Sequence, residues 1–168
     1  MVYLKTIVPR LTTNKDIIEK TKIMKTDEEI LEYLLSKNIA FDEIIKAFER
    51  YYGIKHILLS DLEVEQDLIN KFDLEILEKQ LVFPYKVDKS RKIYYFVISD
   101  ITNQSLINNM NASCKSMGYK PILHFAFEHE IKEKYKEINA SKNFTPGEDF
   151  DVQTWTNNLI DEGIRLGA

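Results

Sequence analysis

The sequence holds a single cysteine, Cys114, among its 168 residues. One thiol cannot close an internal disulfide, so a small disulfide-stapled fold is excluded and no oxidising compartment is implied. A run of about 18 apolar residues is also missing, and the first 25 residues lack an apolar stretch of signal-peptide length. We therefore expect a cytoplasmic protein that is peripheral to a membrane only through its partners and inserts into none.

The sequence also lacks an excess of positive charge. Its 23 basic and 27 acidic side chains give a net charge of −4 and a pI near 5.5. Nucleic-acid-binding domains normally carry a basic face and a raised pI, so the composition argues against a nucleic-acid partner. Hydrophobic residues at 44% and charged residues at 30% are ordinary for a folded domain, which excludes a disordered chain.

Glycine is scarce, and its spacing excludes a nucleotide-binding motor. The five glycines are Gly53, Gly118, Gly147, Gly163 and Gly167. None begins the G-x-x-x-x-G-K-[ST] loop, whose backbone amides and lysine hold the phosphates of ATP. This chain is therefore not expected to be an enzyme that hydrolyses ATP.

The first third of the chain, residues 1–53, has the pattern of a helical subdomain. A short extended piece is expected to stop at Pro9, because a residue before proline is pushed out of helical geometry. A helix is predicted from Asn14. The capping-box sequence Thr26–Glu29 predicts the start of another. A further helix is predicted over Phe41–Tyr52, ended by a left-handed Gly53.

Residues 54–140 mix strand and helix patterns and form the predicted core. Strands are expected at 54–59, 82–87, 93–99 and 122–127, and helices at 67–72, 74–79, 103–117 and 128–140. The polar residues 88–92 predict a hairpin between the second and third strands. Pro84 places its strand at an edge or beside a bulge. The fold class is α+β, with a small mixed or antiparallel sheet of about three to four strands.

A linker is predicted at 141–150, and an appended helix follows at 151–168. The linker contains Pro146 and Gly147, which break regular structure. The apolar stripe of the appended helix comprises Val152, Trp155, Leu159, Ile160 and Ile164. We interpret it as the first helix of a following domain that is absent from this sequence.

Several short pieces occur in a familiar order. They are LSDLE at 59–63, FPYKV at 83–87, YFVISD at 95–100, MGYKPIL at 117–123, EIKEKY at 130–135 and NNLIDEGIRLGA at 157–168. Their order resembles the N-terminal domain of the ATPases that power type II secretion and type IV pilus assembly. The resemblance implies a motor elsewhere in a longer bacterial protein. It also implies partners: the cytoplasmic part of an inner-membrane platform, or an actin-like scaffold protein, and the ATPase domain of the same protein.

Many members of that family bind cyclic di-GMP through a helical motif that begins Arg-Leu-Gly. Glu29 stands at the arginine position, Leu31 at the first glycine and Asn38 at the second. A carboxylate in place of a guanidinium removes a phosphate donor and adds repulsion. Arg10 and Leu11 match the first two residues of the motif, but the residues that follow them do not match it. We interpret the helix pair as kept for packing or docking. A cyclic di-GMP sensor with a degenerate motif is the alternative.

The sequence shows no group of residues with the spacing of a catalytic or metal-binding site. His124 and His129 are five residues apart with a strand pattern between them, so their side chains should diverge and hold no metal. The acids from Asp61 to Asp67 alternate with apolar residues, as at a solvated strand end, and Cys114 lies in an apolar helical stripe. We expect no catalytic residue, no metal and no cofactor.

Candidate docking residues are aromatic. Tyr51 and Tyr94 each precede a second tyrosine, and periodicity turns one member of each pair outward, where a protein partner can contact it. We predict Tyr51 and Tyr94 as the outward members, although partly buried surface tyrosines without a partner would give the same pattern. Trp155 is the third candidate.

The missing phosphate loop gives the first testable prediction. The purified chain should show neither ATP hydrolysis nor millimolar or tighter affinity for Mg-ATP. Isothermal titration calorimetry measures the affinity directly, and saturable binding of ATP would contradict the prediction.

Overall fold

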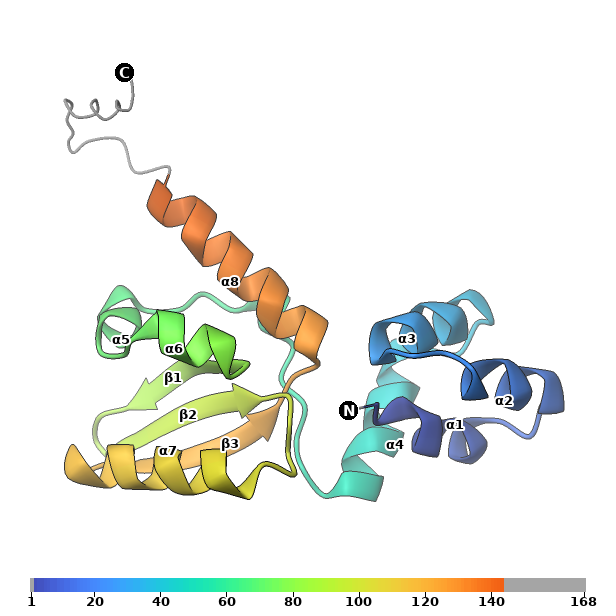
Figure 1. The fold of residues 1–168 in the computed structure, drawn as a ribbon, viewed down its shortest axis with the longest axis horizontal. Coiled ribbons are helices and arrows are strands. Elements are labelled where there is room, and N and C mark those ends of the chain that lie inside the picture. Colours follow the sequence, from blue (N-terminus) through green and yellow to red (C-terminus); the bar gives the residue numbers. More distant parts are fainter. Residues whose placement is uncertain (1, 144–168) are drawn as a thin grey trace, which may run out of the picture. The chain divides into compact units, whose positions relative to one another are not determined.

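The computed structural model describes residues 2–143 (Figure 1). By their internal contacts, residues 2–132 form one compact unit, and the described residues from Glu133 onward are assigned to a second. Helix α8 (Glu128–Asn143) begins in the first unit and extends into the residues predicted as a linker. The rest of the predicted linker and the predicted helix at 151–168 lie outside the described residues.

Four helices make up the first third of the chain. They are α1 (Leu4–Leu11), α2 (Lys15–Lys22), α3 (Asp27–Ser36) and α4 (Phe41–Tyr52). The last three agree with the sequence pattern. The side chain of Asn14 accepts hydrogen bonds from the first turn of α2, and the Thr26 hydroxyl accepts one from Glu29 N of α3, as the capping box predicted.

Helix α1 corrects the prediction of an extended piece before Pro9. Leu4, Ile7 and Val8 are fully buried on one face of α1, and Pro9 lies inside the helix. A proline costs a helix interior about 3 kcal/mol. Burying each of three large aliphatic side chains contributes about 1.5–3 kcal/mol, so tertiary packing outweighs the local preference of the residue before proline.

A mixed three-stranded sheet forms the second part of the first unit. Its strands β1 (Val82–Asp88), β2 (Ile93–Ile98) and β3 (Lys120–Phe125) lie in the order β1-β2-β3. β1 and β2 form the predicted antiparallel hairpin, while β3 pairs parallel to β2 after the crossover helix α7 (Gln104–Ser116). The class is therefore α+β with a mixed sheet, as expected.

Pro84 lies in an edge strand and beside a bulge. The pairing register of β1 with β2 shifts between Pro84 and Lys86, and β1 has β2 as its one neighbour in the described sheet. The missing N–H of a proline is tolerated at such positions, because no central ladder bond is lost there.

The strand predicted at 54–59 is wrong apart from one residue pair. His56 forms an isolated parallel bridge with Phe125, made by Ile57 N donating to Phe125 O and Phe125 N donating to Lys55 O. A short 3-10 turn, Leu59–Asp61, then ends the extended backbone. The two short helices that follow are α5 (Gln66–Asn70) and α6 (Leu74–Lys79), close to the predicted positions.

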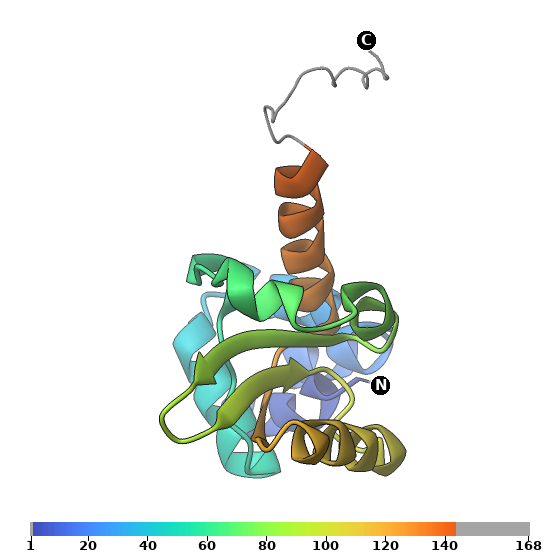
Figure 2. The ribbon, with the colours of Figure 1, turned by 90° about the vertical axis from the view of Figure 1, so that its left-hand side faces the viewer.

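Two hydrophobic clusters fill the first unit. The first joins α1, α3 and α4 to the end of β3, where Phe48 contacts Phe125 and Phe127. The second lies on one face of the sheet, under α5 and α7, and contains Leu68, Tyr94, Phe96, Leu106 and Met110. In Figure 2 the hairpin of β1 and β2 is seen with α5 and α6 above it and α7 below.

Gly53 closes α4 in the left-handed conformation, with φ 69° and ψ 27°. A Cβ at this position would meet no atom within 4 Å, so a substitution is opposed by backbone strain alone. Gly53→Ala should lower the free energy of unfolding by about 1–2 kcal/mol in a urea titration. Gly53→Asn is the control and should cost clearly less, because asparagine tolerates this region. Equal stability of the alanine variant and the wild type would contradict the assignment.

Candidate functional site: a tyrosine junction, a cavity and the predicted docking residues

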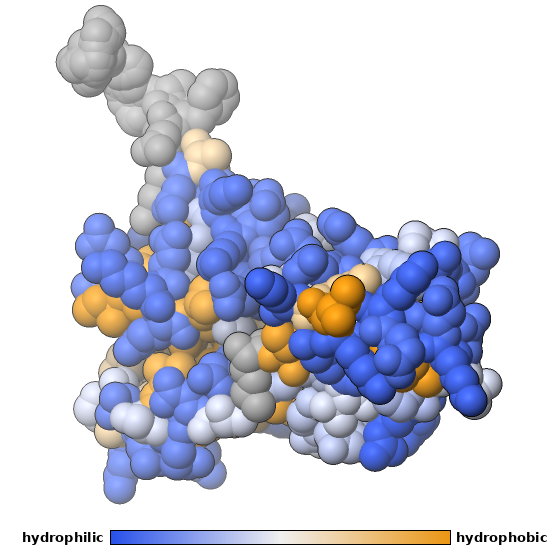
Figure 3. Space-filling view, turned by 45° about the vertical axis from the view of Figure 1, so that its right-hand side comes forward, coloured by the Kyte–Doolittle hydropathy of each residue, from blue (hydrophilic) through white to orange (hydrophobic). Residues whose placement is uncertain are grey.

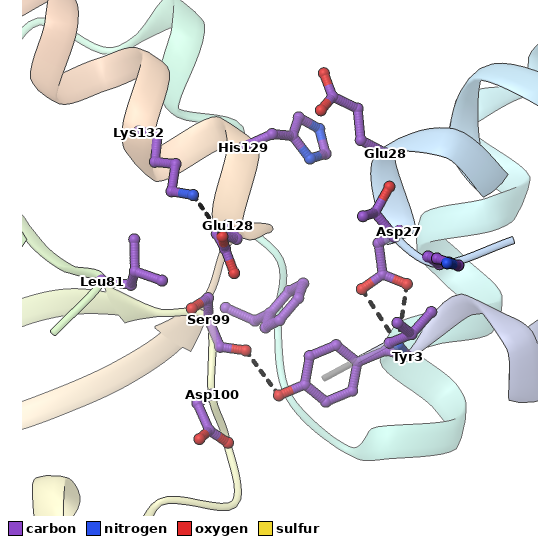
Figure 4. A pocket seen from close by; sticks show the side chains of 13 residues that line it. Tyr3, Asp27, Glu28, Leu81, Ser99, Asp100, Glu128, His129 and Lys132 are labelled. Carbon is purple, nitrogen blue, oxygen red and sulfur yellow. Dashed lines mark hydrogen bonds and ion pairs between the residues drawn. The ribbon is translucent and has the colours of Figure 1, made fainter. Parts of the chain in front are cut away.

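Tyr3 joins the helices of residues 1–53 to the sheet. Its hydroxyl donates to Ser99 O at 2.7 Å and accepts from Ile101 N at 3.1 Å, directly after β2. Its backbone N donates to the Asp27 carboxylate at 2.9 Å, at the start of α3. Figure 4 shows the side chain of Tyr3 reaching from Asp27 to Ser99. One residue thus holds segments that are 24 and 96 positions away in sequence.

The ring of Tyr3 is buried among other aromatic rings. It meets Phe125 and Tyr52 edge to face, each with ring centroids 5.3 Å apart, and Phe48 at 6.0 Å. The Tyr52 hydroxyl donates to the backbone oxygen of Tyr3 at 3.1 Å. Edge-to-face pairs add to the free energy gained by burying the rings, so this cluster fixes α4 and β3 against α1.

Asp27 caps the start of α1 from a distance in sequence. Its Oδ1 accepts from Leu4 N at 2.8 Å as well as from Tyr3 N. Burial raises the pKa of this carboxyl, and the hydrogen bonds from Leu4 and Tyr3 oppose that rise without cancelling it. The first orphan amides of α1 are therefore satisfied by a side chain of α3.

A cavity of about 460 Å³ lies beside this junction. Its lining includes the cations Lys25 and Lys132 and the acids Asp27, Glu28, Asp100 and Glu128. Lys132 Nζ is already paired with a Glu128 oxygen at 2.6 Å (Figure 4). Residues 2–143 contain no group of three or more metal-ligating side chains. The lining therefore holds more acidic than basic side chains, and two of the acids, Asp27 and Glu128, already have partners.

Of the three predicted docking residues, Tyr51 lies at the surface. It is 43% exposed at the end of α4, and the guanidinium carbon of Arg10 lies 4.4 Å from its ring centroid. Its neighbour Tyr52 turns inward, as the periodicity predicted. A role for Tyr51 in docking stays a prediction, and Trp155 lies outside the described residues.

Tyr94 corrects the sequence interpretation, which placed it outward. It is 4% exposed and stacks on Tyr119 with ring centroids 4.4 Å apart, while Phe72 packs edge-on at 5.1 Å. Alternation puts Tyr94 and Phe96 on the sheet face that α5 and α7 cover. The pattern of two adjacent tyrosines cannot tell which sheet face the helices occupy.

The histidines have separate partners. His124 Nδ1 lies 2.6 Å from the Tyr85 hydroxyl, and His56 Nε2 lies 2.8 Å from a Glu130 oxygen. His129 stacks on Phe127. Burial raises the pKa of Tyr85 to about 12 and lowers the pKa of His124. The side chains of His124 and His129 therefore diverge, as the strand pattern between them predicted.

Cys114 is 1% exposed in the buried stripe of α7. Burial raises the pKa of its thiol, which keeps the thiol protonated and unreactive near neutral pH. This agrees with its interpretation as a small hydrophobic residue.

In this structure, the three positions aligned with the cyclic di-GMP motif contribute to a helix cap, to core packing and to a turn. Glu29 Oε1 accepts from Lys25 N and completes the cap of α3. Leu31 is 8% exposed in the first hydrophobic cluster. Asn38 adopts a left-handed φ of 66° just after α3, a conformation that glycine favours and asparagine tolerates. Asn38 thus has a backbone conformation open to glycine, while a capping residue and a packing residue stand at the arginine and first-glycine positions.

Sequence reasoning missed the junction around Tyr3. The sequence pattern predicts an extended piece that stops at Pro9, and it places Asp27 only within the capping box of its own helix. The partners of Tyr3 and Asp27 lie far away in sequence, and no local pattern marks such pairs.

The fold and these sites define a small α+β accessory domain. A family model, described as the MshEN domain, matches residues 42–142. The chain belongs to the MshEN domain family, which confirms the resemblance to the N-terminal domains of type II secretion and type IV pilus assembly ATPases. None of the described helices is long and apolar enough to cross a membrane.

The chain is similar to solved structures of two proteins. A structure of MshE with cdg matches with a TM-score of 0.52 and 10% identity, covering 80% of this chain and 96% of that one. The N-terminal domain of XpsE matches with a TM-score of 0.42 and 14% identity, covering 81% and 95%. No curated protein matches the sequence.

The junction predicts a strong effect of one hydroxyl group. Tyr3→Phe leaves the Ser99 carbonyl and the Ile101 amide without their partner, which should cost about 1–3 kcal/mol of unfolding free energy. Tyr33→Phe is the matched control, because the Tyr33 hydroxyl is buried without a hydrogen-bond partner among the described residues. The two variants are compared by urea unfolding. A control as damaged as Tyr3→Phe would contradict the assignment.

Asp27 predicts a pH dependence. Because its folded-state pKa is raised above its ordinary value of 3.8, the group stabilises the fold below that value and loses this contribution as pH rises through the folded pKa. Asp27→Asn keeps an acceptor oxygen and does not titrate. The stability of the wild type relative to Asp27→Asn should therefore increase from about pH 7 to about pH 4. A decrease over this range, measured by denaturant titration, would show a lowered pKa instead.

Proposed function

We propose that this chain is a non-catalytic docking and regulatory domain of a type II secretion or type IV pilus assembly ATPase. Its work is to tether the motor to the cytoplasmic part of an inner-membrane platform or to an actin-like scaffold protein. The contact is made by α3 and α4, with Tyr51 as its anchor. The observation that carries this proposal is the exposure of Tyr51 at the end of α4. In the same helix pair, Glu29 and Leu31 stand at positions of the cyclic di-GMP motif and contribute to capping and packing.

The outer surface of the α3–α4 pair suits a protein contact. Tyr51 is held by the Arg10 guanidinium, so little side-chain entropy remains to be lost on binding. Leu35 of α3 adds a 42% exposed aliphatic side chain. Tyrosine and arginine are the residue types that most often dominate the binding energy of protein interfaces.

Sensing of cyclic di-GMP is the second candidate, favoured by the structure of MshE with cdg. Against it, the Glu29 carboxylate would repel the phosphates of the ligand, and Leu31 is buried. Calorimetric titration with cyclic di-GMP separates the two candidates. We expect no binding in the micromolar range, and binding in that range would favour the sensor.

Docking is tested by the affinity of the chain for purified cytoplasmic parts of platform and scaffold proteins. Tyr51→Ala should weaken binding about 30-fold, which corresponds to about 2 kcal/mol for a buried interface tyrosine. Ile76→Ala is the control, because Ile76 on α6 is 54% exposed and lies outside the proposed contact. Equal affinity of Tyr51→Ala and the wild type would reject this surface.

Point variants suit this test better than removal of residues 1–53. Such a deletion would take away Tyr3, which binds Ser99 and Ile101, and would expose Phe125 and Phe127 of the first hydrophobic cluster. Loss of binding by the truncated chain would therefore report on misfolding as much as on docking.

A further inference from the structure

A groove of about 750 Å³ opens at the hairpin end of the sheet, away from the residues of the Tyr51 surface. It is bounded by α5, by the ends of β1 and β2, and by the turn between α7 and β3. Its apolar lining comes from Leu68, Val87, Tyr94, Met117 and Tyr119. Figure 3 shows exposed apolar side chains in small groups among mostly hydrophilic ones on one face of the molecule.

The wall of the groove is rigid on one side and adaptable on the other. The rings of Tyr94 and Tyr119 stack with their planes 21° apart, and the ring of Phe72 packs edge-on against Tyr94. Met117, which is 40% exposed, lies at the turn that leads into β3. A flexible thioether beside fixed rings can adjust to an inserted apolar side chain without reorganising the sheet.

The rim of the groove is basic. Lys71 and Lys89 line it and have no ion-pair partner within residues 2–143, whereas Asp67 is its one acidic lining residue. Four further exposed cations belong to the same end of the sheet, where Lys120 N donates to Lys92 O. They are Arg91, Lys92, Lys115 and Lys120.

This local charge differs from that of the chain as a whole. The full sequence carries a net charge of −4. Among the residues that line the groove, Lys71 and Lys89 stand against Asp67, and the neighbouring Asp88 already lies 3.9 Å from Arg91. Such an excess raises the local concentration of an anionic partner and speeds its association.

We propose that this groove binds an extended acidic segment of a partner protein that carries one aromatic or long aliphatic side chain. The apolar side chain enters between Tyr119 and Met117, and flanking carboxylates pair with Lys71 and Lys89. A flat anionic membrane would meet the lysines but leave the concave apolar wall unfilled, so the combination favours a peptide. The inference adds a second surface to the proposed docking function and does not use Tyr51.

The probe is an acetylated and amidated peptide, Asp-Glu-Trp-Glu-Asp, titrated into the ¹⁵N-labelled chain. We expect saturable binding with a dissociation constant of about 1 mM or tighter. The amide shifts should be confined to residues 67–71, 87–94 and 117–120. A peptide with alanine in place of tryptophan, and one with lysine in place of the acids, should bind at least about 10-fold more weakly.

The matched variants separate the groove from general electrostatics. Lys71→Glu with Lys89→Glu should weaken binding about 10-fold or more, whereas Lys5→Glu with Lys15→Glu, an equal change of charge at exposed sites on α1 and α2, should leave it unchanged. The peptide variants keep the test valid if a protein variant fails to fold. Equal weakening by both pairs, or shifts spread over the whole chain, would overturn the proposal.

Vesicles of phosphatidylglycerol form the last arm of the experiment. Binding of vesicles at the groove residues without binding of the peptide would assign the surface to a membrane and overturn the peptide proposal. Because these probes contain no platform or scaffold protein, failure here leaves the Tyr51 surface untouched. Failure of Tyr51 to affect docking likewise leaves the groove untouched.

Discussion

The hydroxyl group of Tyr3 is the contact on which the arrangement of residues 1–132 depends. It satisfies a backbone acceptor and a backbone donor that follow β2, and both would otherwise be left near a buried aromatic cluster without partners. The same residue brings the Asp27 carboxylate to the start of α1. The helices of residues 1–53 are thereby tied to the sheet by directional bonds as well as by apolar contact, which specifies one relative placement.

Local rules predicted the elements whose causes are local. The cap at Thr26, the left-handed Gly53 and the hairpin around residues 88–92 each follow from a few neighbouring residues, and the structure contains all three. Helix α1 and the burial of Tyr94 depend on packing against distant segments. A single sequence does not contain that information in readable form, because the same pattern of apolar residues suits either outcome.

The candidate site shows the same division. The exposure of Tyr51 could be predicted from the helical period, but its contact with Arg10 joins α4 to α1 and could not. Glu29, Leu31 and Asn38 stand where the cyclic di-GMP motif of the family has an arginine and two glycines. Asn38 keeps the left-handed backbone that the loop between α3 and α4 needs, while Glu29 and Leu31 now contribute to capping and packing.

The bulge at Pro84 has a consequence for how this domain can associate. An edge strand normally offers a row of free N–H and C=O groups to any strand that approaches it. In β1 the row is interrupted by a residue that has no N–H and by a shift of register, and beside the end of β3 it is partly taken by Lys55 and Ile57. Growth of the sheet by strands from other molecules is therefore disfavoured at both sides. Copies of this domain can therefore lie close together without their sheets fusing, and recognition is left to side chains.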